Sequence, residues 1–335
     1  MTLDLLFLAP PPSVAAGVRF RVLPYVELAR AQGLDADVRL VPRGPHRRLA
    51  FLAALPRARV MVIHKELFSR PGLARIRRRA DVLAFDFDEA LWTVPPSVPQ
   101  GPGRAKLEAR AARRFKRQCE RVDLLVAGNA FLAARGRNHN VNAAILPTGI
   151  DPTVFTPPVE RPRRERVVAG WMGTAGSLWF LEKAVPDLAQ LADRVELRAV
   201  SDAPYAGQLA DLVASEPWDE AREVAQLQDF DLGLLPLEND QHTRGKCGLK
   251  GLQYMACGAV PVASAVGYNR ELVRHGEDGF LVERPGQWAE FVGLLADDED
   301  LRRRMAEAGR AKVEDRYDVR NQGWRLLDML GLGAP

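Results

Sequence analysis

Short apolar runs alternate with helical stretches along this chain, and the alternation repeats on both sides of one proline-rich segment. Apolar runs that are each followed by a helix are typical of parallel strands covered by helices on both faces. In the first half the expected strands are residues 3–9, 36–41, 60–64, 82–87, 124–127 and 143–146, with helices at 21–32 and 104–121 among the connections. This pattern predicts a doubly wound α/β domain.

Residues 147–162 hold five prolines, so they continue neither a helix nor a central strand, and we expect a linker there. The alternation then restarts, with expected strands at residues 167–171, 195–200, 232–235, 260–263 and 280–282. We therefore predict two Rossmann-like domains, 1–155 and 156–318, and a C-terminal helical segment, 319–335, that returns to the first domain. Such sheets bind ligands outside the carboxyl ends of their strands, so the two domains are expected to face a shared cleft.

Composition narrows the class of protein further. With 47% hydrophobic and 27% charged residues, the 335-residue chain is long enough for two globular cores. The longest apolar runs fall far short of the roughly 20 residues that a membrane span needs, and we expect a cytoplasmic protein. Cys119, Cys247 and Cys257 match neither a disulfide framework nor a metal knuckle, and we expect reduced packing residues.

Residues 104–121 carry eight Lys or Arg against two Glu. Leu107, Ala111, Phe115 and Cys119 share one stripe of the expected helix, and bases fill its other faces. One interpretation is an ordinary solvated helix. The other is an electrostatic contact with an anionic membrane surface or a lipid-phosphate acceptor. No nucleic-acid-binding motif accompanies the charge, so we expect no nucleic-acid partner.

Residues 229–282 contain the features of a phosphate site. Two expected helix N-termini would open onto one edge of the sheet, where unpaired N–H groups attract anions. Arg244, Lys246 and Lys250 could each reach a phosphate oxygen, and Gly248 allows close backbone approach. The alternative is a surface loop in which Gly258 only caps a helix. Earlier in the second domain, a short loop precedes another expected helix and offers either phosphate contacts or a helix cap; its residues are Gly173, Thr174 and Ser177.

The run Arg244-Gly-Lys-Cys-Gly-Leu-Lys-Gly-Leu-Gln-Tyr-Met-Ala-Cys-Gly-Ala-Val-Pro-Val-Ala-Ser resembles the donor-binding signature of retaining GT-B glycosyltransferases, the group 1 or family 4-like enzymes. Four further segments resemble that family in order and spacing, namely residues 147–155, 170–176, 231–237 and 266–282. The last of these segments contains Glu271. The resemblance implies transfer of a sugar from a nucleoside-diphosphate sugar to an acceptor hydroxyl with retention. It also implies a GT-B fold and a reaction without a resident cofactor or metal.

This chain departs from the family signature at two positions. Many relatives carry two glutamates eight positions apart, one near the donor sugar and one on the ribose, where this chain has Gly245 and Gln253. Gln253 is expected to hydrogen-bond ribose hydroxyls through its amide, without the charge of a carboxylate. Lys246 and Lys250 are expected to take over donor contacts.

The first domain is expected to supply the acceptor side. Gly17 matches a family glycine that approaches the donor phosphates, and Arg19 and Arg21 either contact an anionic ligand or lie on a solvated helix face. Asp86 and Asp88 fall at the carboxyl end of the fourth expected strand, where either would orient or deprotonate an acceptor hydroxyl. The alternative is an aspartate that caps the next helix.

His64 ends the third expected strand at the same edge and is a second candidate for proton transfer, although a lone histidine at a strand end is more often structural. A metal held by Asp86 and Asp88 does not fit the helix-dipole phosphate site, so we expect no metal. The leading hypothesis is a glycosyltransferase in glycan or glycoconjugate biosynthesis, acting on a small molecule, a glycan or a lipid carrier. The rivals are a nucleotide-sugar epimerase of the same fold and a non-catalytic nucleotide-sugar-binding protein.

Overall fold

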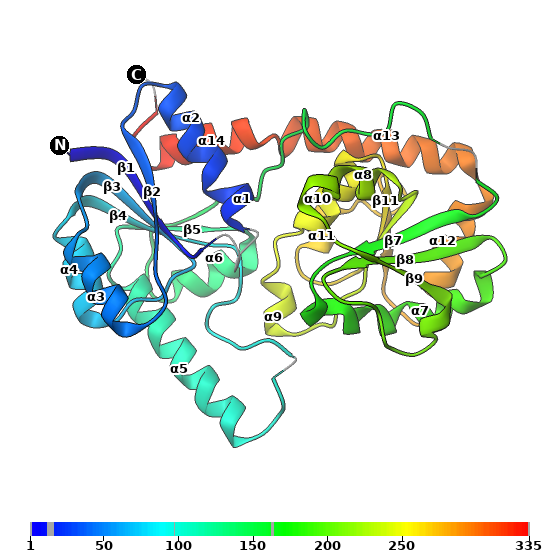
Figure 1. Ribbon diagram of the computed structural model, residues 1–335, viewed down its shortest axis with the longest axis horizontal. Helices are drawn as coiled ribbons and strands as arrows, with labels where there is room; N and C mark the ends of the chain where they lie inside the picture. The colour runs from blue at the N-terminus through cyan, green and yellow to red at the C-terminus, as the bar shows by residue number, and fades with distance from the viewer. Residues whose placement is uncertain (1, 12–16, 97, 162–163, 334–335) are drawn as a thin grey trace. The chain divides into compact units, whose positions relative to one another are not determined.

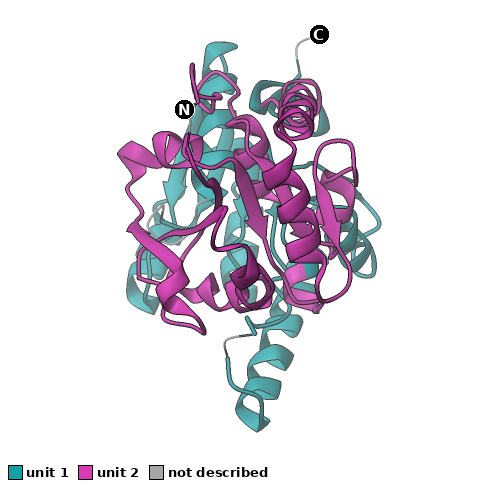
Figure 2. Cartoon of the chain, turned by 90° about the vertical axis from the view of Figure 1, so that its right-hand side faces the viewer, with its two compact units in different colours: residues 1–149, 244–247, 319–335 teal, residues 150–243, 248–318 magenta. Residues whose placement is uncertain are grey.

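The computed structural model describes residues 2–11, 17–96, 98–161 and 164–333. The chain divides into two compact units (Figure 2). Unit 1 comprises residues 1–149, 244–247 and 319–335, and unit 2 comprises residues 150–243 and 248–318. Within the described residues no helix is both long and apolar enough to cross a bilayer.

Unit 1 is built on a six-stranded parallel sheet in the order β2-β1-β3-β4-β5-β6 (Figure 1). Its strands are β1 (Thr2–Ala9), β2 (Ala36–Leu40), β3 (Arg57–His64), β4 (Ala80–Phe87), β5 (Leu124–Ala127) and β6 (Ala143–Ile145). Its helices are α1 (Gly17–Arg21), α2 (Leu23–Ala31), α3 (Pro45–Ala53), α4 (Arg70–Arg77), α5 (Pro102–Cys119), α6 (Ala130–Arg137) and α14 (Val319–Met329). All six strands expected from the sequence in this half are confirmed.

Alternate residues of each central strand enter two different cores. In β1, Leu6 and Leu8 join one buried cluster, whereas Leu5 and Phe7 join the other. Side chains alternate across a strand, so a strand with helices on both faces must be apolar at nearly every position. The helix expected at 21–32 is confirmed as α2, and the short helix α1 precedes it. Pro24 stands in the first turn of α2, where its missing N–H costs no helical hydrogen bond.

The C-terminal helix α14 packs on α2 of unit 1, as the sequence predicted. Leu326 and Leu327 join the core on that face of the sheet. A Cβ on Gly323 would stand 2.5 Å from Leu28 Cδ2, so the two helices approach as closely as a glycine permits.

Unit 2 holds a second six-stranded parallel sheet, in the order β12-β11-β10-β7-β8-β9. Its strands are β7 (Val167–Met172), β8 (Val195–Ser201), β9 (Val213–Pro217), β10 (Leu232–Leu235), β11 (Val260–Ser264) and β12 (Phe280–Val282). Its helices include α7 (Val185–Leu188), α8 (Glu223–Gln228), α10 (Leu249–Ala256), α11 (Asn269–Leu272), α12 (Gln287–Asp297) and α13 (Glu299–Arg316), and α9 (Gln241–Arg244) ends at the first residue of the 244–247 segment.

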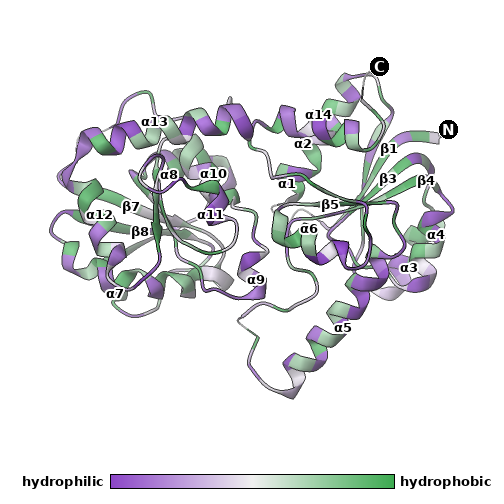
Figure 3. Cartoon of the chain, turned by 180° about the vertical axis from the view of Figure 1, so that it is seen from behind, coloured by the Kyte–Doolittle hydropathy of each residue, from purple (hydrophilic) through white to green (hydrophobic). Residues whose placement is uncertain are grey.

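The sequence did not predict β9. This strand lies at the edge of the sheet and is mostly exposed, so it has no apolar run to reveal it. The segment after Gly173 also differs from expectation, because it is a 3₁₀ helix, η2 (Ala175–Lys183), and not an α-helix. In both units the strands are coloured largely as hydrophobic, and the helices carry many hydrophilic residues (Figure 3).

The chain enters unit 2 six residues earlier than the expected boundary at 155. Ile150 N–H donates to Tyr317 O over 2.8 Å, and Arg310 donates to the carbonyls of Pro152 and Phe155. These contacts tie residues 150–155 to unit 2 because their polar backbone groups are satisfied there.

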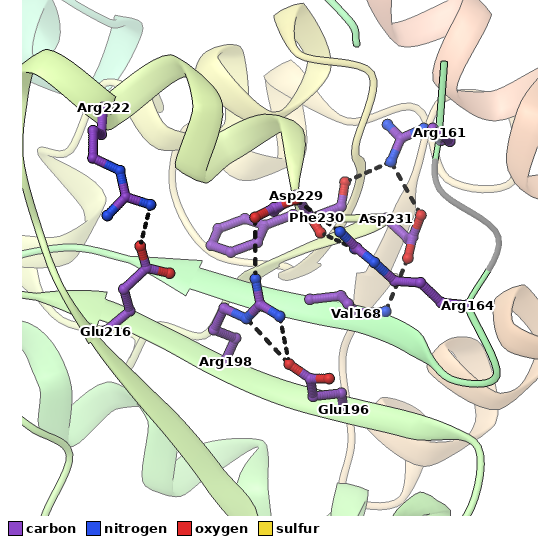
Figure 4. Close-up of polar contacts among 10 residues, drawn as sticks. All are labelled: Arg161, Arg164, Val168, Glu196, Arg198, Glu216, Arg222, Asp229, Phe230 and Asp231. Atoms are coloured by element: carbon purple, nitrogen blue, oxygen red, sulfur yellow. Dashed lines mark hydrogen bonds and ion pairs between the residues drawn. The ribbon is translucent and has the colours of Figure 1, made fainter.

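A group of arginines then anchors the start of the second sheet (Figure 4). Arg161 donates to Phe230 O over 2.8 Å and to Asp231 Oδ1 over 3.0 Å, and the other carboxylate oxygen of Asp231 accepts from Val168 N–H over 2.9 Å. Arg164 makes a similar pair of bonds to Asp229. The segment before β7 is therefore held to the turn before β10.

Candidate functional site

Two residues expected to be catalytic, His64 and Asp86, meet at the carboxyl end of the unit 1 sheet. They are paired across the β3–β4 ladder, and His64 Nδ1 lies 2.5 Å from Asp86 Oδ2. Both side chains are buried. The carboxylate holds the imidazole in one orientation, so Nε2 is the ring nitrogen left to face a ligand.

Arg21 completes this buried group from the end of α1. Its guanidinium forms two bonds to Asp86, with Nη2 2.5 Å from Oδ1 and Nε 3.3 Å from Oδ2, and Nη1 donates to Leu146 O over 2.8 Å. Burial alone would raise the pKa of Asp86, but the charge of Arg21 and the hydrogen bond from His64 outweigh it and lower that pKa.

The structure corrects the interpretation of Arg21 and Asp86. Arg21 is completely buried and ion-paired, so it lies on no solvated helix face and contacts no ligand from solvent. Asp86 is 3% exposed and is enclosed by its two partners, so it does not open toward solvent. It is not a cap for a helix either, because the residues that follow are a turn. Arg19, on the same helix, stacks its guanidinium over Phe20 at 5.2 Å.

A second ionic group lies beside the first. Lys65 Nζ is 3.0 Å from Asp88 Oδ1 and 2.9 Å from Glu89 Oε1. Burial opposes ionisation of Asp88, but the charge of Lys65 outweighs burial and lowers the pKa of Asp88 well below its usual range. Lys65 adopts φ +59°, a left-handed conformation that costs a residue with a side chain roughly 1–2 kcal/mol. In this conformation the lysine side chain contacts Asp88 and Glu89 at the end of the sheet.

Gly17 stands against both groups. A Cβ at this position would be 3.0 Å from His64 Nε2 and 3.2 Å from Asp88 Oδ2. His64 Nε2 is buried and has no hydrogen-bond partner within the part of the chain that the structure describes. Residues 12–16, which precede Gly17, lie outside that part. The structure therefore brings together Gly17, His64 and Asp88, three of the expected site residues.

The segment 244–247 is part of unit 1, and one asparagine holds its backbone. Asn129 caps α6 by accepting from Leu132 N–H over 2.9 Å, and its amide donates to Lys246 O over 3.0 Å and Arg244 O over 3.3 Å. The Arg244 side chain is exposed and that of Lys246 is half-buried. These two expected phosphate ligands therefore lie on a backbone that the first sheet fixes.

Packing explains why no glutamate stands at position 245. A Cβ on Gly245 would lie 2.8 Å from both Ala90 Cβ and Ala90 N. Next to it, Cys247 Sγ packs against Gly128, where a Cβ would be only 2.3 Å from the sulfur. Burial raises the pKa of Cys247, which suits a packing thiol and not a nucleophile.

In unit 2, Lys250, Trp171 and Gly173 form one cluster. Lys250 Nζ lies 4.3 Å from the centre of the Trp171 ring, within the range of a cation–π contact. A Cβ on Gly173 would be 2.1 Å from that nitrogen. Gly248, expected at the same place, precedes α10 with φ +71°, and a Cβ on it would be 2.8 Å from Tyr268 Cδ1. Gly173, Gly248 and Lys250 thus belong to one end of the second sheet.

Two N–H groups in the loop at Gly173 and Thr174 are already hydrogen-bonded within unit 2. Gly173 N–H donates to Val200 O over 3.0 Å, and Ala175 N–H donates to Asp202 Oδ1 over 2.5 Å. Ser177 does not cap the following helix, since its hydroxyl donates to Thr174 O. The group at this place that suits an anion is the ammonium of Lys250, which lies beside the loop.

Gln253 and Glu271, the two remaining residues expected to bind the donor, have different surroundings. Gln253 is 4% exposed, and its amide donates to Glu223 Oε1 of α8 over 3.2 Å, so its side chain is directed at a buried carboxylate. Glu271 is exposed on the short helix α11, and its partial burial raises its pKa. The sequence offered no signal for Glu223, which is remote from the signature.

Sequence reasoning also missed Asn129, Trp171 and the role of Lys65. Lys65 directly follows β3 and Asn129 is the second residue after β5, so a systematic reading of the two residues after each strand would have found both. Trp171 lies inside an apolar run and reads as core. Its contact with Lys250 shows that it also borders a charged group.

Comparison with known proteins places part of this chain in a class. Residues 163–298, less than half of the chain, match the family model of glycosyl transferases group 1. A D-inositol 3-phosphate glycosyltransferase of Thermobispora bispora is 35% identical over 124 residues, which are 36% of this chain and 28% of that protein. A protein of the same name from Xylanimonas cellulosilytica is 29% identical over 196 residues, 50% of this chain and 46% of that protein. The chain thus spans less than half the length of both curated relatives.

Solved structures show the fold. Sucrose-phosphate synthase from Thermosynechococcus elongatus superposes with a TM-score of 0.76 at 16% identity, over 97% of this chain and 98% of that one. HepE from Anabaena, in complex with UDP and glucose, gives 0.69 at 15% identity, over 98% and 99%. The fold is the two-domain α/β fold of the GT-B class, as the sequence predicted.

Proposed function

We propose that this protein is a glycosyltransferase that moves a sugar from a nucleoside-diphosphate sugar to an acceptor hydroxyl. The observation that carries the proposal is the match of residues 163–298 to glycosyl transferases group 1, since that segment contains the Lys250 cluster. The names of the two curated relatives support glycosyl transfer, and the UDP bound by a structural neighbour supports the donor class.

Donor binding is assigned first to Lys250, with Gly173 and Gly248 beside it. A fixed ammonium stabilises the negative charge that develops on a departing diphosphate, and Trp171 keeps the lysine in place. Arg244 and Lys246 are proposed as further phosphate ligands. We propose retention of anomeric configuration, with the departing phosphate oxygen accepting the acceptor proton. Neither a metal nor a cofactor has a role in this proposal.

Acceptor binding is assigned to His64, with Asp86 and Asp88 as positioning residues. The lowered pKa of each carboxylate makes it a weak base near neutral pH, so neither suits the general-base role expected from the sequence. His64 Nε2, by contrast, lies beside Gly17 and is held by Asp86 through the opposite ring nitrogen. We propose that Nε2 hydrogen-bonds the reacting hydroxyl.

Inositol phosphates head the acceptor panel, because the two relatives are named for one. Small molecules, glycans and lipid carriers follow. We propose the cytoplasm as the location, since Cys119, Cys247 and Cys257 are buried, unpaired thiols, as a reducing compartment favours.

The test combines binding with turnover. Thermal unfolding is measured with UDP, GDP and ADP and their glucose conjugates, because a ligand that binds only the folded state raises stability. Nucleotide release is then measured with each acceptor. We expect one nucleotide to stabilise the protein and its release to depend on acceptor.

Interconversion of the donor sugar without acceptor and without net nucleotide release would establish the epimerase instead. Binding with no turnover across the panel would establish the non-catalytic protein. Lys250→Ala is expected to abolish nucleotide stabilisation, whereas Lys183→Ala, a surface lysine of unit 2 paired with Glu238, is the matched control.

A further inference from the structure

Helix α5 and the segment before it form a projection from unit 1 that the proposed reaction does not use (Figures 1 and 2). We call residues 94–96 and 98–110 the arm: a loop followed by the first half of α5. In the second half of α5, Phe115, Gln118 and Cys119 are buried in the domain. In the first half, every described residue from 102 to 110 is exposed except Arg104 and Glu108, which are half-buried.

The loop of the arm is tied to the first half of α5 by polar contacts. Arg104 donates to the carbonyls of Val94, Pro95 and Val98 over 3.1, 2.9 and 2.7 Å. It also pairs with Glu108 at 3.0 Å, and Glu108 accepts from Thr93 Oγ1 over 3.1 Å. The only carboxylate of this part of α5 is therefore used to fold the loop back onto the helix.

Four cations form a stripe along the outer face of α5. Lys106, Arg110, Arg113 and Arg117 follow one another at spacings of four, three and four residues, which puts them on the same side of a helix. The side chains of Lys106, Arg110 and Arg113 make no ion pair or hydrogen bond to any residue that the structure describes. Arg117, nearer the domain, donates to Phe68 O over 3.3 Å. The stripe is thus an excess of positive charge without internal compensation.

An apolar groove accompanies the stripe. It has a volume of about 590 Å³ and lies between the loop and the helix, where Val98, Pro99 and Leu107 line it and Lys106 and Arg110 also border it. Leu107 is 47% exposed, although a leucine gains most when it is buried. An apolar surface next to a row of cations is complementary to a partner that presents anionic groups and hydrocarbon together.

We infer that the arm docks the protein on the surface of a bilayer that contains anionic phospholipids. The stripe of Lys106, Arg110 and Arg113 faces the phosphates, and Leu107 with the Val98–Pro99 edge of the groove enters the boundary between headgroups and acyl chains. Binding of this kind adds apolar burial to electrostatic attraction. A membrane is favoured over a nucleic acid because residues 94–110 include no aromatic side chain on which a base could stack.

The test uses the full chain and vesicles of phosphatidylcholine alone or with 30% phosphatidylglycerol, followed by flotation. We expect binding only to the anionic vesicles, with weakening as NaCl rises, because salt screens exposed charges. Replacing Lys106, Arg110 and Arg113 by Gln is expected to reduce partitioning on the order of 100-fold, at about 1 kcal/mol for each cation near a membrane surface. Leu107→Ser is expected to reduce it about tenfold.

Matched controls lie on unit 2. Arg284, Arg303 and Arg304 are exposed, so changing all three to Gln removes the same net charge from another surface. Leu294→Ser matches Leu107→Ser, since Leu294 is 45% exposed. Both controls are expected to bind as the unchanged protein does. All of these substitutions are on the surface, where effects on stability are usually within about 0.5 kcal/mol.

Several results would overturn the inference. They are equal binding to neutral vesicles, no binding to either kind, equal losses in the control variants, or displacement of the vesicles by a DNA duplex that binds more tightly through the same residues. Competition by free glycerol phosphate distinguishes a binding site for one headgroup from docking on a membrane surface. If it competes at micromolar concentration, a soluble phosphate is the ligand and the membrane is not. No sugar transfer is measured, so failure here leaves the proposed function untouched.

Discussion

Removing Arg21 tests the idea that a buried ion pair organises the end of the first sheet. Arg21→Met keeps much of the side-chain volume but deletes two bonds to Asp86 and one to Leu146 O. Among the described residues, Asp86 then keeps only His64 as a side-chain partner, and it is 3% exposed. Breaking a buried pair by removing one partner costs about 3–5 kcal/mol, because an uncompensated charge remains inside. That is a large share of a typical stability of roughly 5–15 kcal/mol.

The assay is native-state hydrogen exchange read peptide by peptide, because a two-domain chain has no single unfolding free energy. Protection in β1, β3 and β4 is expected to fall on the order of 100- to 1,000-fold, at about 1.4 kcal/mol per tenfold. Peptides of unit 2, such as those of β10 and β11, are the internal control. The double variant Arg21→Met with Asp86→Leu is expected to recover part of the loss, since it removes both charges of the pair and leaves neither of them buried without its partner. A fall of less than tenfold in the single variant would refute the reasoning.

Three further predictions concern the same region. Asp88 has a lowered pKa in the folded protein, so its contribution to stability is full above the ordinary pKa of about 3.9 and is lost as pH falls through the lowered value. Asp88→Asn is therefore expected to flatten the fall of the urea-unfolding free energy of unit 1 below about pH 4, and an unchanged slope would contradict this. Gly245→Glu, which introduces the glutamate of the signature that this segment resembles, is expected to destabilise unit 1 by about 1–3 kcal/mol through its contact with Ala90, measured by urea unfolding with Gly176→Ala as the open-space control. If Gly245→Glu leaves the unfolding free energy unchanged or raises activity, the space for this side chain exists. Gly128→Ala is expected to cost a similar amount, and Cys247→Ala in the same chain to return most of it, because the clash is with the sulfur. If adding Cys247→Ala does not restore stability, the close approach of Cys247 Sγ is not the cause of the loss in Gly128→Ala.

Much of the fold could be predicted from apolar periodicity. Eleven expected strands are present, and only the exposed edge strand β9 escaped, because an edge strand without a buried face leaves no pattern. The start of α2 could also have been read from Pro24. Less of the site could be predicted. The sequence pointed to the strand ends where His64, Asp86 and Asp88 lie, but it did not show which of them would be enclosed.

The amino-acid sequence by itself determined the two parallel sheets, the buried free cysteines and the candidate site positions, because these depend on residue type and on spacing within one element. Only the tertiary structure decided the fate of each charge. Arg21 contacts Asp86 and Leu146, which are separated from it by 65 and 125 positions in the sequence. Its burial therefore follows from contacts that no local pattern encodes. Likewise, Gly245 is required by Ala90, and Gln253 is directed at Glu223. Whether a polar group is buried, paired or open to a ligand depends on partners that folding brings together, because the free energy of burying a charge is set by its neighbours in space.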